Sequence, residues 1–368
     1  YFIFENIMFF NMKGIILHGG HGTRLRPLTH TGPKQLLPIA NKAMSQYALE
    51  DLKTAGITQI GIIIGDVYPE KVKEYYGDGS KFGVTITYIY QDAPKGISHA
   101  IKLCKDFIGN DKFIVYLGDN VLRKDLTDYT KKFTTSNSDA MILLCKVDDP
   151  QRFGIAELDK DNTGMIKKIM EKPKDPPSNL AVIGIYFLTP KIFDIIDNLK
   201  PSWRGELEIT DALDMLLHDG NNVSFDTVTG WWKDTGTPED IIHANKLVLD
   251  SIGTENQFLL DKDSKIQGNI ITGINTQISR DSFVNGPVII GKNCSIGPAA
   301  RIGPYVSIGD NCTIKNCNIE NSIVMSDCCV TVKSNISDSI IAHGSTIEDH
   351  GISKKQQFLV GERSHLKI

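Results

Sequence analysis

The sequence lacks any long hydrophobic run and any long stretch of basic residues. No segment approaches the ~20 apolar residues that a transmembrane helix needs, so no membrane contact is expected. The 368 residues carry a net charge of −4, which argues against a basic groove for nucleic acid. The seven cysteines form no CxxC pair and their number is odd, which disfavours a zinc site or a disulfide framework. We therefore expect a reduced, cytoplasmic protein.

The first residues also lack the marks of a secretion signal. The opening YFIFENIMFFN is aromatic but short, and it has neither a basic flank nor a small-residue cleavage site. Met12 is a more natural start for the first strand, so we expect residues 1–11 to form an N-terminal extension.

From residue 12 to about residue 252, strand-like apolar runs alternate with helix-like stretches. Strands are expected over GIIL, IGIIIG, VTITYIY, FIVYLGD and AMILLCKV, and helices near residues 45–55, 69–77 and 97–107. This alternation is typical of a Rossmann-like α/β fold with a mostly parallel sheet and helices on both faces. Such sheets bind ligands beyond the carboxyl ends of their strands.

After about residue 251, isoleucines recur every six residues, and the first four of the series below are each followed by glycine. No helix keeps a six-residue period on one face, whereas a triangular coil with one aliphatic residue per side does. The pattern therefore resembles the hexapeptide repeats of a left-handed parallel β-helix. Val324, Val330 and Ile336 suggest further coils. The series is Ile290, Ile296, Ile302, Ile308 and Ile314.

These patterns divide the chain into two domains. We expect residues 12–252 to form the α/β domain, residues 253–265 a linker, residues 266–352 the β-helix and residues 353–368 a C-terminal tail. Cys294 and Cys312 lie eighteen residues apart at one hexad position, which is one full coil. Small side chains occupy the equivalent positions, so we expect both thiols to pack inside the coil.

Three glycines and two arginines follow the first expected strand. In IILHGGHGTRLRPLT, Gly19, Gly20 and Gly22 precede Arg24 and Arg26. Glycine lets backbone N–H groups approach a ligand closely, and arginine offers a planar fork of donors for phosphate oxygens. The stretch fits neither the Walker loop nor the GxGxxG fingerprint. A polyphosphate-binding loop is expected, and a tight turn with surface arginines is the alternative.

The stretch GGHGTRLRPLTHTGPKQLLPIANKAM resembles the signature of sugar-1-phosphate nucleotidylyltransferases, in particular the glucose-1-phosphate thymidylyltransferase group. The similarity continues in order through QDAPKGISHAI, YLGDN, FGIAELD, EKP, AVIGIYFL, RGELEITDA and WWKDTGTPEDIIHAN, up to about residue 250. With the β-helix attached, the chain is similar to the long two-domain members of that family. The resemblance implies an Mg²⁺-dependent transferase that makes dTDP-glucose and pyrophosphate from dTTP and glucose 1-phosphate.

The resemblance also implies the catalytic residues. Arg24 matches the catalytic arginine near the β- and γ-phosphates, and Lys34 matches the lysine that contacts the transferring α-phosphate. Asp119 and Asp234 match the pair of carboxylates that hold Mg²⁺, an ion that favours few carboxylates plus phosphate oxygens. A sugar 1-phosphate is already an anionic nucleophile, so the task is positioning and electrostatic stabilisation rather than general-base catalysis.

Substrate-binding residues follow in the same way. Arg204 and Glu206 lie in a segment that closes around the sugar in relatives. Gln35 and Gln91 match positions that contact thymine, and a glutamine amide can meet part of its imide edge. The residues matched to the nucleotide are Leu17, Gly19, Gly20, Gly22, Thr23, Gln35, Gln91 and Gly96, and those matched to the sugar phosphate are Gly154, Glu171, Lys172 and Tyr186.

The chain departs from the family pattern at two positions. His18 stands where relatives usually carry a small residue, and Ala43 replaces a proline. The imidazole is expected close to the nucleoside pocket, where it would alter affinity or base preference. His18 and His21 could suggest a metal pair, but no third ligand is apparent, so no metal site is expected there.

Other functions remain open at this point. Within the class, a uridylyltransferase or an enzyme that accepts several nucleotides or sugar phosphates is the alternative. From another class, the β-helix could carry acetyltransferase activity with His343 as its base. A catalytically dead regulatory subunit is disfavoured, because the catalytic arginine, lysine and both aspartates are present. Since hexapeptide domains often trimerise and short thymidylyltransferases are commonly tetrameric, a homo-oligomer is expected.

Overall fold

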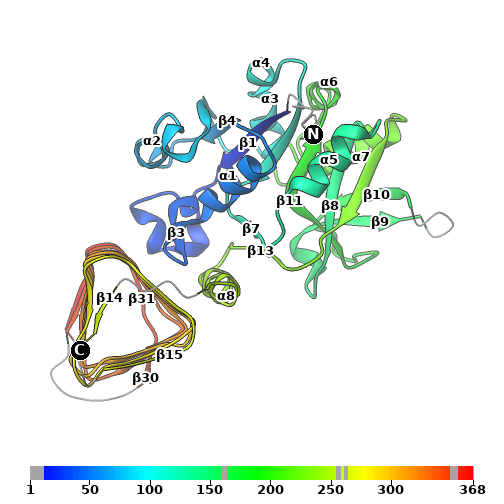
Figure 1. Cartoon of the computed structure of the whole chain (residues 1–368). Coiled ribbons are helices and arrows are strands. Elements are labelled where there is room, and N and C mark those ends of the chain that lie inside the picture. Colours follow the sequence, from blue (N-terminus) through cyan, green and yellow to red (C-terminus); the bar gives the residue numbers. More distant parts are fainter. Residues whose placement is uncertain (1–11, 160–163, 254–257, 261–263, 349–354, 368) are drawn as a thin grey trace, which may run out of the picture. The chain divides into compact units, whose positions relative to one another are not determined.

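The computed structural model describes residues 12–159, 164–253, 258–260, 264–348 and 355–367 (Figure 1). The chain forms two compact units: residues up to 20 together with 45–232, and residues 21–44 together with 233–368. The extension expected over residues 1–11 lies outside the described residues. Among the residues described, no helix is long and apolar enough to cross a membrane.

The first unit is built on a nine-stranded sheet with the order β10-β9-β11-β6-β1-β4-β5, in which β8 pairs with β11 and β12. The central strand β1 pairs in parallel with β4 and β6, and β4 pairs in parallel with β5. Strand β11 is antiparallel to β6, β8 and β9. The strands are β1 (Met12–His18), β4 (Gln59–Ile64), β5 (Thr85–Tyr90), β6 (Lys112–Leu117), β8 (Ala140–Lys146), β9 (Gly154–Leu158), β10 (Ile166–Glu171), β11 (Leu180–Leu188) and β12 (Val223–Thr227).

Helices connect these strands, which confirms the α/β class expected from the sequence. The helix expected over residues 97–107 is divided in two, because the N–H of Cys104 bonds the carbonyl of Ile101 and tightens the turn between them. The helices are α1 (Met44–Thr54), α2 (Pro69–Tyr76), α3 (Ile97–Lys102), α4 (Lys105–Ile108), α5 (Thr127–Thr135), α6 (Lys191–Asp197) and α7 (Ile209–His218). Short elements are β7 (Asn120–Leu122) and the 3₁₀ turns η4 (Ser80–Phe82) and η5 (Pro150–Arg152).

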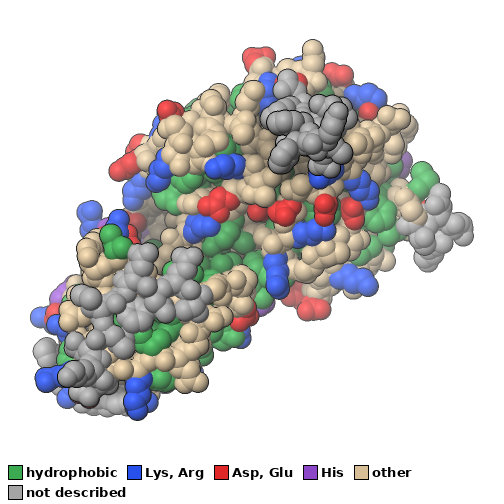
Figure 2. Space-filling model, viewed as in Figure 1, with side chains coloured by type: hydrophobic (Ala, Val, Ile, Leu, Met, Phe, Trp, Pro, Cys, Tyr) green, Lys and Arg blue, Asp and Glu red, His purple; other side chains and the backbone are tan. Residues whose placement is uncertain are grey.

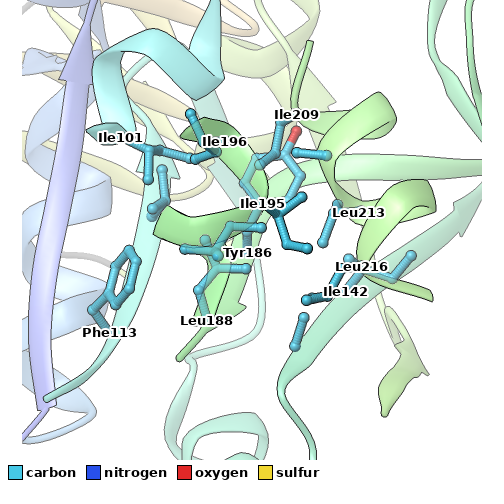
Figure 3. Packing of buried hydrophobic residues seen from close by; sticks show 14 of the residues in the cluster. Ile101, Phe113, Ile142, Tyr186, Leu188, Ile195, Ile196, Ile209, Leu213 and Leu216 are labelled. Atoms are coloured by element: carbon cyan, nitrogen blue, oxygen red, sulfur yellow. The ribbon is translucent and has the colours of Figure 1, made fainter. Parts of the chain in front are cut away.

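The core of this unit lies between the sheet and the helices α3, α6 and α7. Figure 3 shows Ile142 and Tyr186 from the strands facing Ile195 and Leu213 from the helices. Burying such apolar side chains stabilises the fold by roughly 25 cal/mol for each Å² removed from water. On the face seen in Figure 2, Lys and Arg side chains are interspersed with Asp and Glu.

The second unit begins with residues 21–44, which we name the phosphate-loop segment after the loop that the sequence predicts within it. Its 3₁₀ turns are η1 (Thr23–Leu25), η2 (Leu28–His30) and η3 (Lys34–Leu36), and its short strands are β2 (Pro38–Ile39) and β3 (Lys42–Ala43). Strand β13 (Trp232–Asp234) leads to helix α8 (Pro238–Leu249). Thr237 caps this helix by accepting a hydrogen bond from the N–H of Asp240, and proline follows at the first helical position.

The remainder of the second unit is a left-handed parallel β-helix with three flat sides, as expected from the sequence (Figure 1). One side contains β14 (Phe258–Leu260), β17 (Thr276–Ile278), β20 (Ser295–Ile296), β23 (Thr313–Lys315), β26 (Cys329–Thr331), β29 (Thr346–Glu348) and β32 (His365–Lys367). The second contains β15 (Lys265–Gln267), β18 (Phe283–Asn285), β21 (Arg301–Ile302), β24 (Asn318–Glu320), β27 (Asn335–Ser337) and β30 (Lys355–Gln356). The third contains β16 (Ile270–Thr272), β19 (Val288–Ile290), β22 (Val306–Ile308), β25 (Ser322–Val324), β28 (Ile340–Ile341) and β31 (Leu359–Val360).

Asparagine and aspartate shape the corners of the coil. Asn275, Asn293, Asn311 and Asp327 all have positive φ, a conformation that these two residue types tolerate better than most. Each asparagine amide donates to the side-chain oxygen of the next coil, at 3.2, 3.1 and 2.9 Å along the column. The corners are therefore fixed by a ladder of side-chain hydrogen bonds.

The coils extend further than the sequence predicts. After Ile314, the buried aliphatic positions come at Ile319 and Val324, five residues apart instead of six, because these corners hold one residue fewer. The later coils at Val330 and Ile336 are confirmed. Strands continue through residues 355–367, so the stretch expected to be a tail contributes to the β-helix, as does β14 in the expected linker.

The domain boundaries themselves stay a prediction. The sequence assigns residues 21–44 and 233–252 to the α/β domain, whereas these segments group with the β-helix in the second compact unit.

The thiols of one corner column point into the β-helix. Cys294, Cys312 and Cys328 are buried, and each Sγ donates to a backbone carbonyl of the next coil at 3.1 Å. All seven cysteines are free thiols. The thiols in the column therefore fill space as small hydrophobic groups, as the hexad position indicates.

The buried aliphatic column makes a charge inside the coil costly. Ile302 is 1% exposed and pairs with Val284 and Ile319 of the neighbouring coils. We predict that Ile302→Asp destabilises the β-helix by roughly 3–5 kcal/mol and lowers the yield of soluble protein, since the carboxylate has no partner there. The control is Arg301→Asp on the exposed side of the same strand. Equal thermal unfolding midpoints for the two variants would contradict the prediction.

Candidate active site

Three predicted nucleotide-binding residues and the predicted metal ligand Asp119 lie at one edge of the sheet in the first unit. Leu17 pairs with Ile63 of β4 and Leu117 of β6, so the carboxyl ends of these parallel strands align. The N–H of Gly118 bonds the carbonyl of Leu17 at 3.0 Å, and the N–H of Gln91 bonds the carbonyl of Ile64 at 2.8 Å. Leu17, Gly19, Gln91 and Asp119 therefore follow adjacent strand ends, where open α/β sheets bind ligands.

The Gln91 side chain is held in one orientation. Its Nε2 lies 3.1 Å from Nδ1 of His99 and 3.5 Å from the carbonyl of Gly96, and burial lowers the pKa of the His99 imidazole. A neutral imidazole accepts from the amide N–H₂, which leaves Oε1 directed toward Gly19. A Cβ placed on Gly19 would lie 3.8 Å from that oxygen. The edge beside Gly19 thus presents a hydrogen-bond acceptor.

Gly96 is the N-cap of α3 and has a φ of +101°, a conformation that favours glycine. A Cβ there would lie 2.5 Å from the carbonyl oxygen of Leu207. Glycine is thus required at this position, because the backbone of Leu207 approaches it closely.

Asp119 follows β6 and accepts a hydrogen bond from Nδ2 of Asn120 at 3.0 Å. The Asn120 Oδ1 accepts from the indole N–H of Trp232 at 2.6 Å and from the N–H of Gly184 at 3.3 Å. Asn120 is 2% exposed and fixes the strand end that carries Asp119. Sequence reasoning missed this supporting role, although YLGDN contains the residue.

The second unit contains Arg24, Lys34, Gln35 and Asp234. Gly22 has φ of +59°, and its carbonyl accepts from the Thr29 hydroxyl at 2.8 Å and from the N–H of Leu25 at 2.9 Å. These bonds close the turn that begins η1 and exposes Thr23 and Arg24. The segment folds as a set of tight turns, and its binding of polyphosphate stays a prediction.

Arg24 and Asp234 come together around Gly236. A Cβ on Gly236 would lie 3.2 Å from Oδ2 of Asp234 and 3.6 Å from Nη1 of Arg24. A guanidinium beside a carboxylate suits a ligand that carries both phosphate oxygens and a metal ion. Of the four predicted catalytic residues, Asp119 alone belongs to the first unit.

The predicted sugar residues lie together in the first unit. Gly154 begins β9, Glu171 ends β10, and the two are paired in antiparallel register. Oε1 of Glu171 lies 3.3 Å from Lys172 Nζ and 3.3 Å from Arg204 Nη1. Tyr186 is 4% exposed, and burial raises the pKa of its hydroxyl, with the negative charge of Glu171 adding to the shift.

Two residues that contact the predicted sugar-binding residues were not identified from the sequence. The Thr210 hydroxyl donates to Oε2 of Glu171 at 3.0 Å, and Glu208 accepts from Arg204 at 3.3 Å and from the Ser202 hydroxyl at 2.9 Å. Burial raises the pKa of the Glu208 carboxyl. Both lie in RGELEITDA, so the motif located the segment but not these contacts.

His18 is a buried, neutral side chain. It is 5% exposed, its ring meets Tyr76 edge-on at 5.9 Å, and burial lowers its pKa to about 3. Within the described part of the chain, neither ring nitrogen has a hydrogen-bond partner. No group of three or more His, Cys, Asp or Glu side chains that could hold a metal occurs in the described residues.

His343 lies on the outside of the β-helix, where its Nδ1 is 3.3 Å from Oδ2 of Asp327. A cavity of about 620 Å³ opens elsewhere in the second unit, between α8 and the β-helix, and is lined by Ile242, His243, Ile340 and Phe358 among others. None of the predicted site residues lines it.

Comparison with known proteins identifies both parts of the chain. Residues 13–251 match the family model described as Nucleotidyl transferase, and residues 284–367 match the GMPPB C-terminal domain. The chain is 47% identical over 359 residues to low-salt glycan biosynthesis nucleotidyltransferase Agl11 of Haloferax volcanii, an alignment that covers 97% of this chain and 100% of the relative.

Two thymidylyltransferases are also similar. A glucose-1-phosphate thymidylyltransferase of Streptomyces griseus is 42% identical over 260 residues, which cover 71% of this chain and 72% of the relative. The crystal structure of a putative glucose-1-phosphate thymidylyltransferase from Bacillus anthracis, in complex with a sucrose, has a TM-score of 0.62 and 44% identity. It covers 67% of this chain and 98% of that one. With its full-length match to Agl11 and its nucleotidyl transferase signature over residues 13–251, the chain belongs to the nucleotidyl transferase family.

Proposed function

We propose that this protein transfers a thymidylyl group from dTTP to glucose 1-phosphate and releases pyrophosphate. The reaction class is supported by one observation above the others: Arg24 of the phosphate-loop segment and Asp234 of β13 converge on Gly236, just after β13. The choice of thymidine nucleotide is supported by Gln91 and by the similarity to thymidylyltransferases.

The reaction requires no base from the protein. An oxygen of the sugar phosphate forms a bond to the α-phosphorus of dTTP, and the bond from that phosphorus to the bridging oxygen breaks, so pyrophosphate leaves with the electron pair. Arg24 stabilises the charge that develops on the leaving phosphates, and Lys34 orients the α-phosphate.

Members of this family generally use a divalent metal ion. We propose Mg²⁺ held by Asp119, which follows β6, and Asp234, which ends β13, because Mg²⁺ prefers a few carboxylates plus phosphate oxygens. The bound ion would neutralise phosphate charge and orient the triphosphate. We further propose that the protein acts in the cytoplasm as a homo-oligomer, a trimer or tetramer.

The charged side chains around Arg204 support the proposed binding of the sugar phosphate. Glu171, Glu206 and Glu208 surround Arg204, and carboxylates arranged in this way accept hydrogen bonds from sugar hydroxyls. Lys172, whose φ is +41°, pairs with Glu171 and is proposed to bind the sugar phosphate.

Nucleotide preference provides the test of the proposed function. The fixed acceptor Oε1 of Gln91 suits a base with an imide N–H, as in thymine and uracil, whereas the ring nitrogen on the pairing edge of adenine is an acceptor and the only donor there is the exocyclic amine of a larger base. Guanine has a ring N–H but is larger. We predict strong rejection of ATP and GTP, and less than roughly tenfold preference for dTTP over UTP from the methyl group alone.

The measurement is kcat/KM for pyrophosphate release from each nucleotide with glucose 1-phosphate and Mg²⁺. Equal values for GTP and dTTP would overturn the role of Gln91 and Gln35 as base readers. Release from none of the nucleotides would overturn the proposed function.

The metal proposal predicts the effect of removing one carboxylate. Asp119→Asn and Asp234→Asn each deprive Mg²⁺ of half its protein ligands, so turnover should fall at least ~100-fold, about 2.7 kcal/mol. Asp128→Asn, an exposed carboxylate on α5, is the control. The thermal unfolding midpoint is measured in parallel, and near-normal turnover in both aspartate variants would show that the metal is held elsewhere.

The lack of room for a side chain at Gly154 gives a further prediction. A Cβ on this residue would lie 2.5 Å from Cγ2 of Thr210 and 3.4 Å from Oε2 of Glu171. Gly154→Ala should therefore displace Thr210 and Glu171, destabilise the fold by about 1–3 kcal/mol and raise the KM for glucose 1-phosphate.

The double variant with Thr210→Ser is the matched rescue, because serine keeps the hydroxyl that bonds Glu171 and lacks the methyl group. Denaturant unfolding and steady-state kinetics should show recovery relative to the single Gly154→Ala variant. A double variant as impaired as the single one would rule out this steric explanation.

A further inference from the structure

One buried amide joins three segments of the second unit. Asn245 of α8 is 1% exposed, and its Oδ1 accepts two hydrogen bonds. One comes from the backbone N–H of Ala40 at 2.8 Å, and the other comes from the hydroxyl of Ser307 at 2.7 Å. Ala40 lies in the phosphate-loop segment, and Ser307 is a fully buried residue of β22 in the β-helix.

A second bond links the same turn directly to the β-helix. Nδ2 of Asn41 donates to the carbonyl of Ile308 at 2.5 Å. Ala40 and Asn41 both have positive φ, +47° and +62°, as in the tight turns that join two antiparallel strands. The turn between β2 and β3 is therefore fixed in conformation and attached at two adjacent residues.

The other part of the segment also meets the β-helix. A Cβ placed on Gly361 would lie 3.4 Å from Cβ of Pro27. The phosphate-loop segment thus has contacts with the β-helix both after η1 and at the β2–β3 turn.

The β2–β3 turn is connected to Lys34 by strand pairing and backbone hydrogen bonds. Pro38 pairs with Ala43 and Ile39 pairs with Lys42, so β2 and β3 form one small hairpin. The N–H of Leu37 bonds the carbonyl of Lys34 at 3.0 Å, and the carbonyl of Leu37 accepts from the N–H of Met44 at 3.0 Å. A displacement of the hairpin is therefore transmitted to Lys34 and Gln35.

We propose that the β-helix is a working part of the catalytic machinery, with Asn245 and Ser307 as positioning residues that fix Lys34 and Gln35 for reaction with the nucleotide. The inference rests on the proposed function for its kinetic effects. A misplacement of about 1 Å in a positioning group is enough to cost substantial rate, whereas the sugar residues on β9 and β10 belong to the other unit and are untouched.

Two variants remove the bridge from opposite sides. Asn245→Leu replaces the amide by an apolar side chain of similar size, and Ser307→Ala removes only the donor from the β-helix. Ser339→Ala is the matched control, because its hydroxyl is also fully buried in the β-helix but bonds Ser337 and Phe358 instead. Ser307→Ala is the milder change and keeps the test informative if Asn245→Leu folds poorly.

Two measurements decide the inference. We expect Asn245→Leu to lower kcat at least tenfold and raise the KM for dTTP, with the KM for glucose 1-phosphate within twofold of the parent. Ser307→Ala should act in the same direction, and Ser339→Ala should leave all three constants unchanged. Hydrogen exchange followed by mass spectrometry should show faster exchange over residues 37–44 in the two bridge variants only.

Unchanged exchange over residues 37–44 in both bridge variants would overturn the inference, as would equal kinetic constants for the bridge variants and the control. An inactive parent protein would overturn the proposed function instead, and the exchange experiment would still decide whether the bridge holds the segment.

Discussion

The register of β1 against β4 and β6 is the constraint on which the proposed nucleotide site in the first unit depends. Because all three strands run in parallel, pairing Leu17 with Ile63 and Leu117 brings their carboxyl ends to one edge. A slip of one residue would move every side chain of β1 to the opposite face. The observed register places three features at the same edge of the sheet: the glycines after β1, Gln91 after β5 and Asp119 after β6.

The two units contribute different electrostatics to the proposed reaction. Arg24 and Lys34 in the second unit supply positive charge suited to phosphates. In the first unit, three glutamates surround Arg204, and burial raises the pKa of Glu208 in spite of that arginine. Phosphates and sugar hydroxyls need opposite partners, and in the proposed reaction each compact unit supplies one kind.

The six-residue repeat of buried positions was sufficient to predict the β-helix, and short apolar runs were sufficient to predict the parallel strands. The strict six-residue interval is broken between Ile314 and Val324, where shortened corners change the spacing without changing the fold, although Val324 itself marks a coil as predicted. Motifs located the segments that contain Glu171 and Asp119, but not the hydrogen bonds of Thr210 and Asn120. Asn245 gives no signal at all, since one amide in an amphipathic helix resembles a solvated residue until the partners across the chain are known.

The column of thiols inside the β-helix offers a chemical measure of which coils are closed. A solenoid is held by contacts between neighbouring coils, so a coil at the end has one neighbour whereas an inner coil has two. Cys294, Cys312 and Cys328 each mark one coil and are protected from reagents only while that coil stays closed. The order in which an alkylating agent reaches them therefore records the direction and extent of opening, one coil at a time.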